Sequence, residues 1–382
     1  MIGFETPEFQ ARVARAQGHM GIASLDALLL TTEPEVRYFT GYLTRFWESP
    51  TRPWFVILPA TGAPIAVIPS IGEPLMGQTW VQDIRTWRSP DYSDDGIGLL
   101  AEALGDVVPE GGRIGVPSGP ETHLRLPLAS WTDLRQRMAT CSFTDDAGIL
   151  RRLRLIKSGA EVEKIAAACR VADAAFARVP EIARAGTPLA GVFRAFQMLC
   201  LEEGADWVSY LAGGAGPGGY GDIIAPATQT PLETGDVLML DTGVVRDGYF
   251  SDFDRNWSVG RPSGATRDAY ARLLDASDAA FATARPGATA ADLFHAMDGV
   301  LTGGAGGSDA GRYGHGLGMQ LTEWPSLIPD DHTVLEPGMV LTLEPGLETD
   351  GGKVLVHEEN IVITPTGARY LSIPAPRELT VI

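Results

Sequence analysis

Residues Val237–Trp257, VLMLDTGVVRDGYFSDFDRNW, consist of two β-prone runs separated by Asp247-Gly248. This dipeptide favours a tight hairpin turn, because both central residues of such a turn need positive φ. Pairing outward from the turn brings Asp252 onto the same face of the hairpin as Asp241, since side chains alternate between faces along a strand. The stretch therefore predicts a hairpin in which two carboxylates are diagonal neighbours.

A second hairpin is predicted in residues 339–364, MVLTLEPGLETDGGKVLVHEENIVIT. Its turn falls on residues 350–352, Asp-Gly-Gly, and Glu344 and Glu358 lie equally far from Gly351 on either side. Two more carboxylates are thus expected roughly opposite each other.

A histidine in the segment YGHGLGM completes the pattern. Its small glycine neighbours let the backbone bring His315 close to another element. Five residues able to bind metal then follow one another along the last part of the chain: Asp241, Asp252, His315, Glu344 and Glu358.

Four converging carboxylates repel one another and raise their own pKa values, so such a cluster makes physical sense when cations neutralise it. Oxygen-rich ligation with one imidazole suits divalent Mn, Co, Zn or Fe, and an acid-rich site suits two ions roughly 3.5–4 Å apart. Taken singly, an Asp in a hairpin is usually a turn or surface residue, and a His in a glycine-rich loop is usually structural. The joint pattern predicts a dinuclear metal site.

These motifs resemble the superfamily of methionine aminopeptidase, aminopeptidase P, prolidase and creatinase, which has the pita-bread fold. Its metal-dependent members carry their ligands in Leu-Asp-x-Gly, Gly-Tyr-x-Ser-Asp, Gly-His-Gly-Leu-Gly, Leu-Thr-x-Glu-Pro-Gly and Glu-Asn-Ile contexts, and all five positions are filled here. The resemblance implies amide hydrolysis by a metal-activated water, with Glu344 carrying the proton from the water to the leaving nitrogen.

The resemblance extends over nearly the whole chain. Residues 26–42, DALLLTTEPEVRYFTGY, look like the N-terminal domain of the prolidase and creatinase branch, and residues 153–176 look like the start of its catalytic domain. We expect an α/β creatinase-type domain over 1–150 and a pita-bread catalytic domain over 151–382, an α+β protein overall.

Local patterns agree with this division. Short apolar runs alternate with helix-like segments over the first ~145 residues. Ser158 followed three residues later by Glu161 forms a capping box that should open a long helix through about Ala183.

The chain departs from the peptidase pattern around the substrate. Thr322 stands where peptidases of the family carry a substrate-contacting His seven residues after His315, and a second such His is missing upstream of the first hairpin. The Arg expected two residues before the last Glu is Val356, with His357 beside the ligand instead. We interpret Thr322 and His357 as substrate contacts. Asp254, where many relatives have Thr, is either a further ligand or a neighbouring acid.

The segment Arg45 to Trp54, RFWESPTRPW, is aromatic and basic. One interpretation of this segment is ordinary: its Trp side chains pack in the core and its Arg side chains are solvated. In relatives with this N-terminal domain, however, the equivalent region of one subunit reaches its partner's active site. The resemblance therefore implies a homodimer in which Trp47 or Arg45 lines the partner's pocket, where an aromatic face or a guanidinium can bind a charged group.

The composition excludes several other classes. A formal net charge of -18 over 382 residues and a pI near 4.7 argue against binding to nucleic acid or anionic membranes. No apolar run approaches the ~20 residues of a membrane span. Three widely spaced Cys suggest no disulfide framework, so we expect a cytoplasmic location.

Three functions remain compatible with the sequence. The architecture favours a metal-dependent Xaa-Pro aminopeptidase or dipeptidase acting on small peptides. The substituted substrate positions and the aromatic, basic segment favour a hydrolase or lyase for a betaine-like, cyclic-amidine or dimethylsulfoniopropionate-type small molecule. A non-enzymatic binding module is the third, but such domains usually lose the metal ligands that this chain retains.

Overall fold

The computed structural model describes residues 3–49, 52–306 and 311–382. The chain divides into two compact units, Met1–Arg154 and Leu155–Ile382.

The N-terminal unit is built on one six-stranded sheet with the order β4-β3-β2-β1-β5-β6. β2 runs antiparallel to both of its neighbours, and the other three strand pairs are parallel. The strands are β1 (Ala27–Leu30), β2 (Phe55–Pro59), β3 (Ile65–Pro69), β4 (Asp83–Trp87), β5 (Arg113–Val116) and β6 (Ser142–Asp145).

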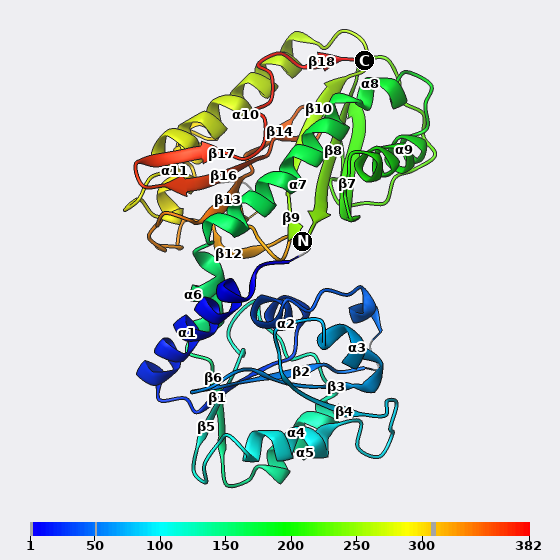
Figure 1. Cartoon of the computed structure of the whole chain (residues 1–382). Helices are drawn as coiled ribbons and strands as arrows, with labels where there is room; N and C mark the ends of the chain where they lie inside the picture. The colour runs from blue at the N-terminus through cyan, green and yellow to red at the C-terminus, as the bar shows by residue number, and fades with distance from the viewer. Residues whose placement is uncertain (1–2, 50–51, 307–310) are drawn as a thin grey trace. The chain divides into compact units, whose positions relative to one another are not determined.

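Helices cover both faces of this sheet, with α2 and α3 on one face and α4 and α5 on the other (Figure 1). Leu100 of α4 and Leu134 of α5 pack with Leu29, Ile57 and Val67 of the strands in one buried core. This arrangement confirms the predicted α/β domain. Its helical segments are α1 (Thr6–Ala23), α2 (Glu33–Thr40), η1 (Phe46–Glu48), η2 (Ser70–Gly72), α3 (Glu73–Met76), α4 (Ile97–Gly105), α5 (Leu128–Arg137) and α6 (Ile149–Leu155).

The described residues of the C-terminal unit form three sheets. One has the order β18-β10-β8-β7 with β9 paired to β8, the second is β12-β11-β13-β16-β17, and the third is the pair β14-β15. The strands are β7 (Trp207–Pro217), β8 (Asp236–Arg246), β9 (Tyr249–Phe250), β10 (Phe253–Ser258), β11 (His315–Gly316), β12 (Glu323–Ser326), β13 (Val340–Leu343), β14 (Gly346–Thr349), β15 (Lys353–Val356), β16 (Glu359–Thr364), β17 (Gly367–Tyr370) and β18 (Thr380–Val381).

The first predicted hairpin is confirmed. Asp247 (φ 49°) and Gly248 (φ 76°) both adopt the positive φ that its tight turn requires. The strands then pair in the predicted register, so that Asp254 lies directly opposite Asp241.

The second hairpin also has the predicted register, in two sections. Leu343 of β13 pairs with Glu359 of β16, and Gly346 of β14 pairs with Val356 of β15. Glu344 and Glu358 lie where one section ends and the next begins.

The helices of this unit support the two large sheets (Figure 1). Leu273 of α10 and Leu293 of α11 pack with Leu341 of β13 and Ile361 of β16. The helices are α7 (Gly159–Ala177), α8 (Val179–Ile182), α9 (Leu189–Glu202), α10 (Gly264–Thr283) and α11 (Ala290–Leu301).

The long helix after Ser158 begins with the predicted capping box, in which Ser158 and Glu161 bond to each other's backbone N–H groups. It ends at Ala177, earlier than the predicted Ala183. Pro180 follows and lacks the backbone N–H that would continue the hydrogen-bond ladder of this helix, so a separate turn, α8, takes over.

Among the described residues, no helix combines the length and the apolar character that crossing a membrane requires.

Candidate metal centre

Four of the five predicted ligands converge in the C-terminal unit. One potential ligand atom from each of Asp252, His315, Glu344 and Glu358 lies within 4.8 Å of the others. Three of these side chains are buried and Glu344 is half-buried. The two Glu and Asp252 all lie at breaks between strand sections.

His315 directs one ring nitrogen at the acids. Its Nε2 lies 2.9 Å from Glu344 Oε1 and 3.4 Å from Asp252 Oδ2. Its Nδ1 lies 2.8 Å from the carbonyl oxygen of Gly316, a geometry in which Nδ1 donates and Nε2 is left to act as a ligand. A Cβ at Gly316 would come within 2.1 Å of the Trp324 carbonyl oxygen, so only glycine fits beside this histidine.

Asp241, the fifth predicted ligand, lies on β8 beside this quartet. Asp254 lies directly across the strand pair from it. Burial raises the pKa of Asp241, and the charges of Asp254 and Glu344 raise it further. A hydrogen bond involving Tyr210 offsets part of that shift. Asp241 thus interacts with members of the quartet, although it is not among the four residues whose ligand atoms lie within 4.8 Å of one another.

Burial and mutual repulsion dominate the electrostatics of the cluster. Burial first, then the neighbouring carboxylates, raise the pKa values of Asp241, Asp252 and Glu358 well above the ordinary range. Glu344 differs. Burial raises its pKa, but the charge and hydrogen bond of His315 outweigh this effect and hold that pKa at about 2.

The cluster has the features expected of a cation site. Two oxygens of the proposed ligands, Asp241 Oδ1 and Glu358 Oε1, are buried and have no hydrogen-bond partner among the described residues. Unpartnered buried carboxylate oxygens are costly, and a divalent cation both satisfies them and favours their ionised form. One imidazole and several carboxylates fit such an ion.

Sequence reasoning missed two residues that touch the ligands. The Thr342 hydroxyl donates to Glu344 and accepts from the backbone N–H of His315. Its position two residues before Glu344 on a strand was an available signal, because side chains two apart share a face. Tyr210 comes from β7, whose irregular pairing with β8 gave no such signal.

The two predicted substrate contacts have different environments. Thr322 is half-buried, and its hydroxyl accepts a hydrogen bond from Arg312 Nη2 (3.3 Å). Sequence reasoning also missed Arg312. Its charge lowers the pKa of Asp252 and so offsets part of the rise that burial and the neighbouring acids cause. His357 is only 1% exposed and lies between Asp254 and Glu359 rather than on an open surface.

Arg45 and Trp47 belong to the N-terminal unit. Trp47 is buried there against Trp54 and under the guanidinium of Arg125. Arg45 is exposed and pairs with Glu48 at 2.6 Å.

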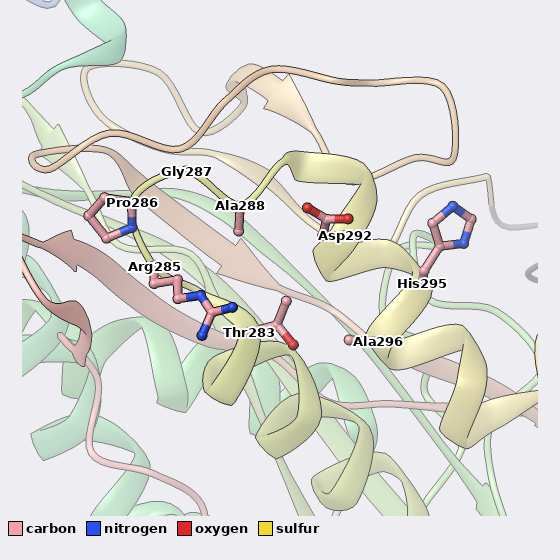
Figure 2. Close-up of a pocket in the computed structure, with 8 residues that line it drawn as sticks. All are labelled: Thr283, Arg285, Pro286, Gly287, Ala288, Asp292, His295 and Ala296. Atoms are coloured by element: carbon pink, nitrogen blue, oxygen red, sulfur yellow. The ribbon is translucent and has the colours of Figure 1, made fainter.

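A separate cavity of about 740 Å³ opens between the end of α10 and the start of α11 (Figure 2). It contains none of the predicted ligands. Its lining residues are Thr283, Arg285, Pro286, Gly287, Ala288, Asp292, His295 and Ala296. Asp292 already caps α11 through Thr289, so the cavity carries no sign of a built site.

Known proteins resemble the chain over its whole length. It is 30% identical to the probable dipeptidase PepE of Mycobacterium tuberculosis, covering 99% of this chain and 98% of that protein. It is 26% identical to an Xaa-Pro dipeptidase of Pyrococcus horikoshii, covering 91% and 93%. The crystal structure of dipeptidase PepE from Mycobacterium ulcerans superimposes with a TM-score of 0.84, at 28% identity and 99% coverage of both chains.

Family profiles divide the chain in the same order. Residues 12–156 match the creatinase/prolidase N-terminal domain, and residues 163–365 match metallopeptidase family M24. These matches and the prolidase-like architecture confirm the fold implied by the sequence motifs. With a cluster of residues that could hold a metal ion in the matching domain, the chain belongs to metallopeptidase family M24 and is a metallohydrolase.

Proposed function

We propose that this metallohydrolase cleaves the amide bond of Xaa-Pro peptides with the help of two divalent metal ions. The observation that carries the proposal is the convergence of Asp252, His315, Glu344 and Glu358, with Asp241 beside them. The relative from Pyrococcus horikoshii that is named an Xaa-Pro dipeptidase supports this choice of substrate.

The ligands in this proposal are the four acids and the one imidazole predicted from the sequence: Asp241, Asp252, His315, Glu344 and Glu358. When bound, divalent ions such as Mn, Co, Zn or Fe polarise the substrate carbonyl and make water more acidic. A fifth candidate ligand, Asp241, beside the four clustered residues supports two ions rather than one.

Glu344 is the proposed proton carrier. Its carboxylate lies beside His315 within the cluster, where it can accept the proton of the attacking water and deliver it to the leaving nitrogen. Thr342 and His315 both hold Oε1 of this carboxylate, which fixes the direction in which it points.

A small-molecule enzyme is the second candidate. The altered substrate positions favour it, because Thr322 offers a hydroxyl where related peptidases use an imidazole. Arg312, which donates to Thr322, suits a carboxylate on the substrate. A dipeptide and a betaine-like compound both carry a carboxylate. The cationic end of the substrate therefore distinguishes the peptidase from the small-molecule enzyme.

A substrate screen tests the proposal. Protein loaded with Mn²⁺ or Co²⁺ is given Ala-Pro and Gly-Pro, their Ala-Ala and Gly-Ala counterparts, an Xaa-Pro tripeptide, and betaine-like and sulfonium compounds. We expect the Xaa-Pro peptides to be cleaved fastest. Turnover of a small molecule with no cleavage of any peptide would instead establish the second candidate.

We also propose a cytoplasmic homodimer in which Arg45 reaches the partner's active site. The exposed guanidinium of Arg45 supports this role, whereas the burial of Trp47 within its own unit suits a supporting one. Free Cys141, Cys169 and Cys200 are compatible with a reducing compartment.

A further inference from the structure

Asp254 is a buried acid that the proposed reaction does not use. It is fully buried and lies opposite Asp241 in the β8–β10 pair. Its Oδ1 accepts a hydrogen bond from the backbone N–H of Glu358 at 3.0 Å. Asp254 therefore contacts the main chain of one proposed ligand and faces the side chain of another.

The next residue on β10 holds the other end of the same peptide segment. Arg255 Nη1 donates to the carbonyl oxygen of Glu358 at 3.1 Å. Glu358 needs such support because β15 ends at Val356 and β16 begins at Glu359, so it lies between two strand sections. Two consecutive residues of β10 thus supply the hydrogen bonds that hold the Glu358 backbone.

His357 links this clamp to a second acid. Its Nδ1 lies 3.5 Å from Asp254 Oδ1, and its Nε2 lies 3.4 Å from Glu359 Oε1. Glu359 in turn accepts from Arg255 Nη2 at 3.0 Å. Asp254, His357, Glu359 and Arg255 form a buried array in which acids and bases alternate.

We propose that Asp254 is a positioning residue of the metal centre. With Arg255 and His357 it fixes the peptide that carries Glu358, so that the Glu358 carboxylate faces Asp252, His315 and Glu344. Asp254 does this without contacting substrate. The inference rests on the proposed metal centre but not on the proposed peptide substrate.

Three variants separate positioning from direct ligation. Asp254→Ala removes the acceptor for the Glu358 N–H, whereas Asp254→Asn keeps an acceptor of the same shape and removes only the charge facing His357. His357→Gln removes the imidazole that lies between Asp254 and Glu359. Asp331→Ala is the control, because Asp331 is also a buried acid that accepts from backbone N–H groups, those of Ser326 and Thr333.

The readout is Mn²⁺ binding to metal-free protein, measured by titration calorimetry, with circular dichroism to verify folding. Loss of an outer partner of a metal ligand typically weakens metal affinity about 10- to 100-fold. We expect a loss of that size for Asp254→Ala, a smaller one for Asp254→Asn, and an unchanged number of ions bound. The effects of Asp254→Asn and His357→Gln should be less than additive, and Asp331→Ala should bind Mn²⁺ as the parent does.

Two results would overturn the inference. Parental affinity in folded Asp254→Ala would show that the clamp is dispensable, and a loss of one bound ion per chain in Asp254→Asn would make Asp254 a ligand itself. A parent protein that binds no Mn²⁺, Co²⁺ or Zn²⁺ would overturn both the inference and the metal centre. A parent that binds metal but cleaves no Xaa-Pro peptide would contradict only the proposed substrate.

Discussion

Thr342 orients the carboxylate of Glu344. Its hydroxyl accepts a hydrogen bond from the backbone N–H of His315 at 3.0 Å, which leaves the hydroxyl proton directed at Glu344 Oε1. One side chain therefore couples the position of the imidazole to that of the proposed proton carrier.

Replacing Thr342 by Val should lower kcat while changing KM little. Valine keeps the shape but leaves the buried His315 N–H without its acceptor, which costs about 1–3 kcal/mol. Thr342→Ser retains the hydroxyl and should restore most of the rate. Steady-state kinetics on both variants test this role of the hydroxyl. Equal values of kcat for Thr342→Val and Thr342→Ser would contradict it.

Loss of the central ligands should abolish turnover and lower bound metal while leaving the fold intact. Asp252→Ala and His315→Ala each remove a member of the quartet, whereas exposed His332→Ala provides a matched control. Metal analysis after dialysis and activity assays give the readout. Full activity of either ligand variant after chelation would refute the metal centre. Some loss of thermal stability is expected, because bound metal stabilises the native state.

Glu344→Gln should reduce the rate far more than it weakens metal binding. The amide retains an oxygen that can still act as a ligand, but it cannot carry a proton. Loss of general acid–base catalysis typically lowers kcat about 10²- to 10⁴-fold. Rate and metal content are measured on the same sample, and an unchanged rate would require another proton carrier.

Lys157→Met should destabilise the C-terminal unit. Lys157 Nζ lies 3.0 Å from Glu323 Oε2, and both side chains are almost fully buried. Removing one partner of such a pair leaves an uncompensated charge and costs about 3–5 kcal/mol. Glu323 also accepts from the N–H groups of Met319 and Gln320, so the loop after His315 should loosen too.

Thermal unfolding measures this cost. The exposed pair of Arg137 and Asp133 is the control, because surface ion pairs contribute about 0–1 kcal/mol. Adding Glu323→Gln to Lys157→Met should recover part of the stability, since it removes the stranded charge. A single Lys157→Met variant as stable as the parent would show that the pair is not needed.

Arg45→Ala should raise KM without removing metal, whereas Trp47→Ala should in addition lower the stability of the N-terminal unit. Trp47 is buried, and truncating a buried Trp typically costs about 3–5 kcal/mol. Kinetics, metal analysis and sedimentation are the measurements. An active monomer, or a parental KM in Arg45→Ala, would contradict the proposed dimer.

The sequence was most informative where local rules set the geometry. The Asp247-Gly248 turn determines the register of the first hairpin, and the symmetric spacing about Gly351 determines that of the second. Both registers agree with the structure. The Ser158 capping box is local in the same way.

The contacts that sequence reasoning missed depend on long-range packing. Tyr210 approaches Asp241 only because β7 pairs with β8 through an irregular register. His357, which the sequence predicts to contact substrate, lies between two acids, one of them from β10, a strand about one hundred residues earlier. No spacing rule connects such positions, because the intervening chain folds into other elements.

The two-stranded arm formed by β14 and β15 also limits which insertions and deletions the protein can tolerate. It separates the two glutamates symmetrically, so adding one residue to each strand would lengthen the arm and leave both glutamates aligned. An unpaired insertion within one strand would turn every side chain beyond it to the opposite face, including Glu358. Insertions and deletions of odd length should therefore survive selection only in the turn at residues 350–352, where a loop can absorb them.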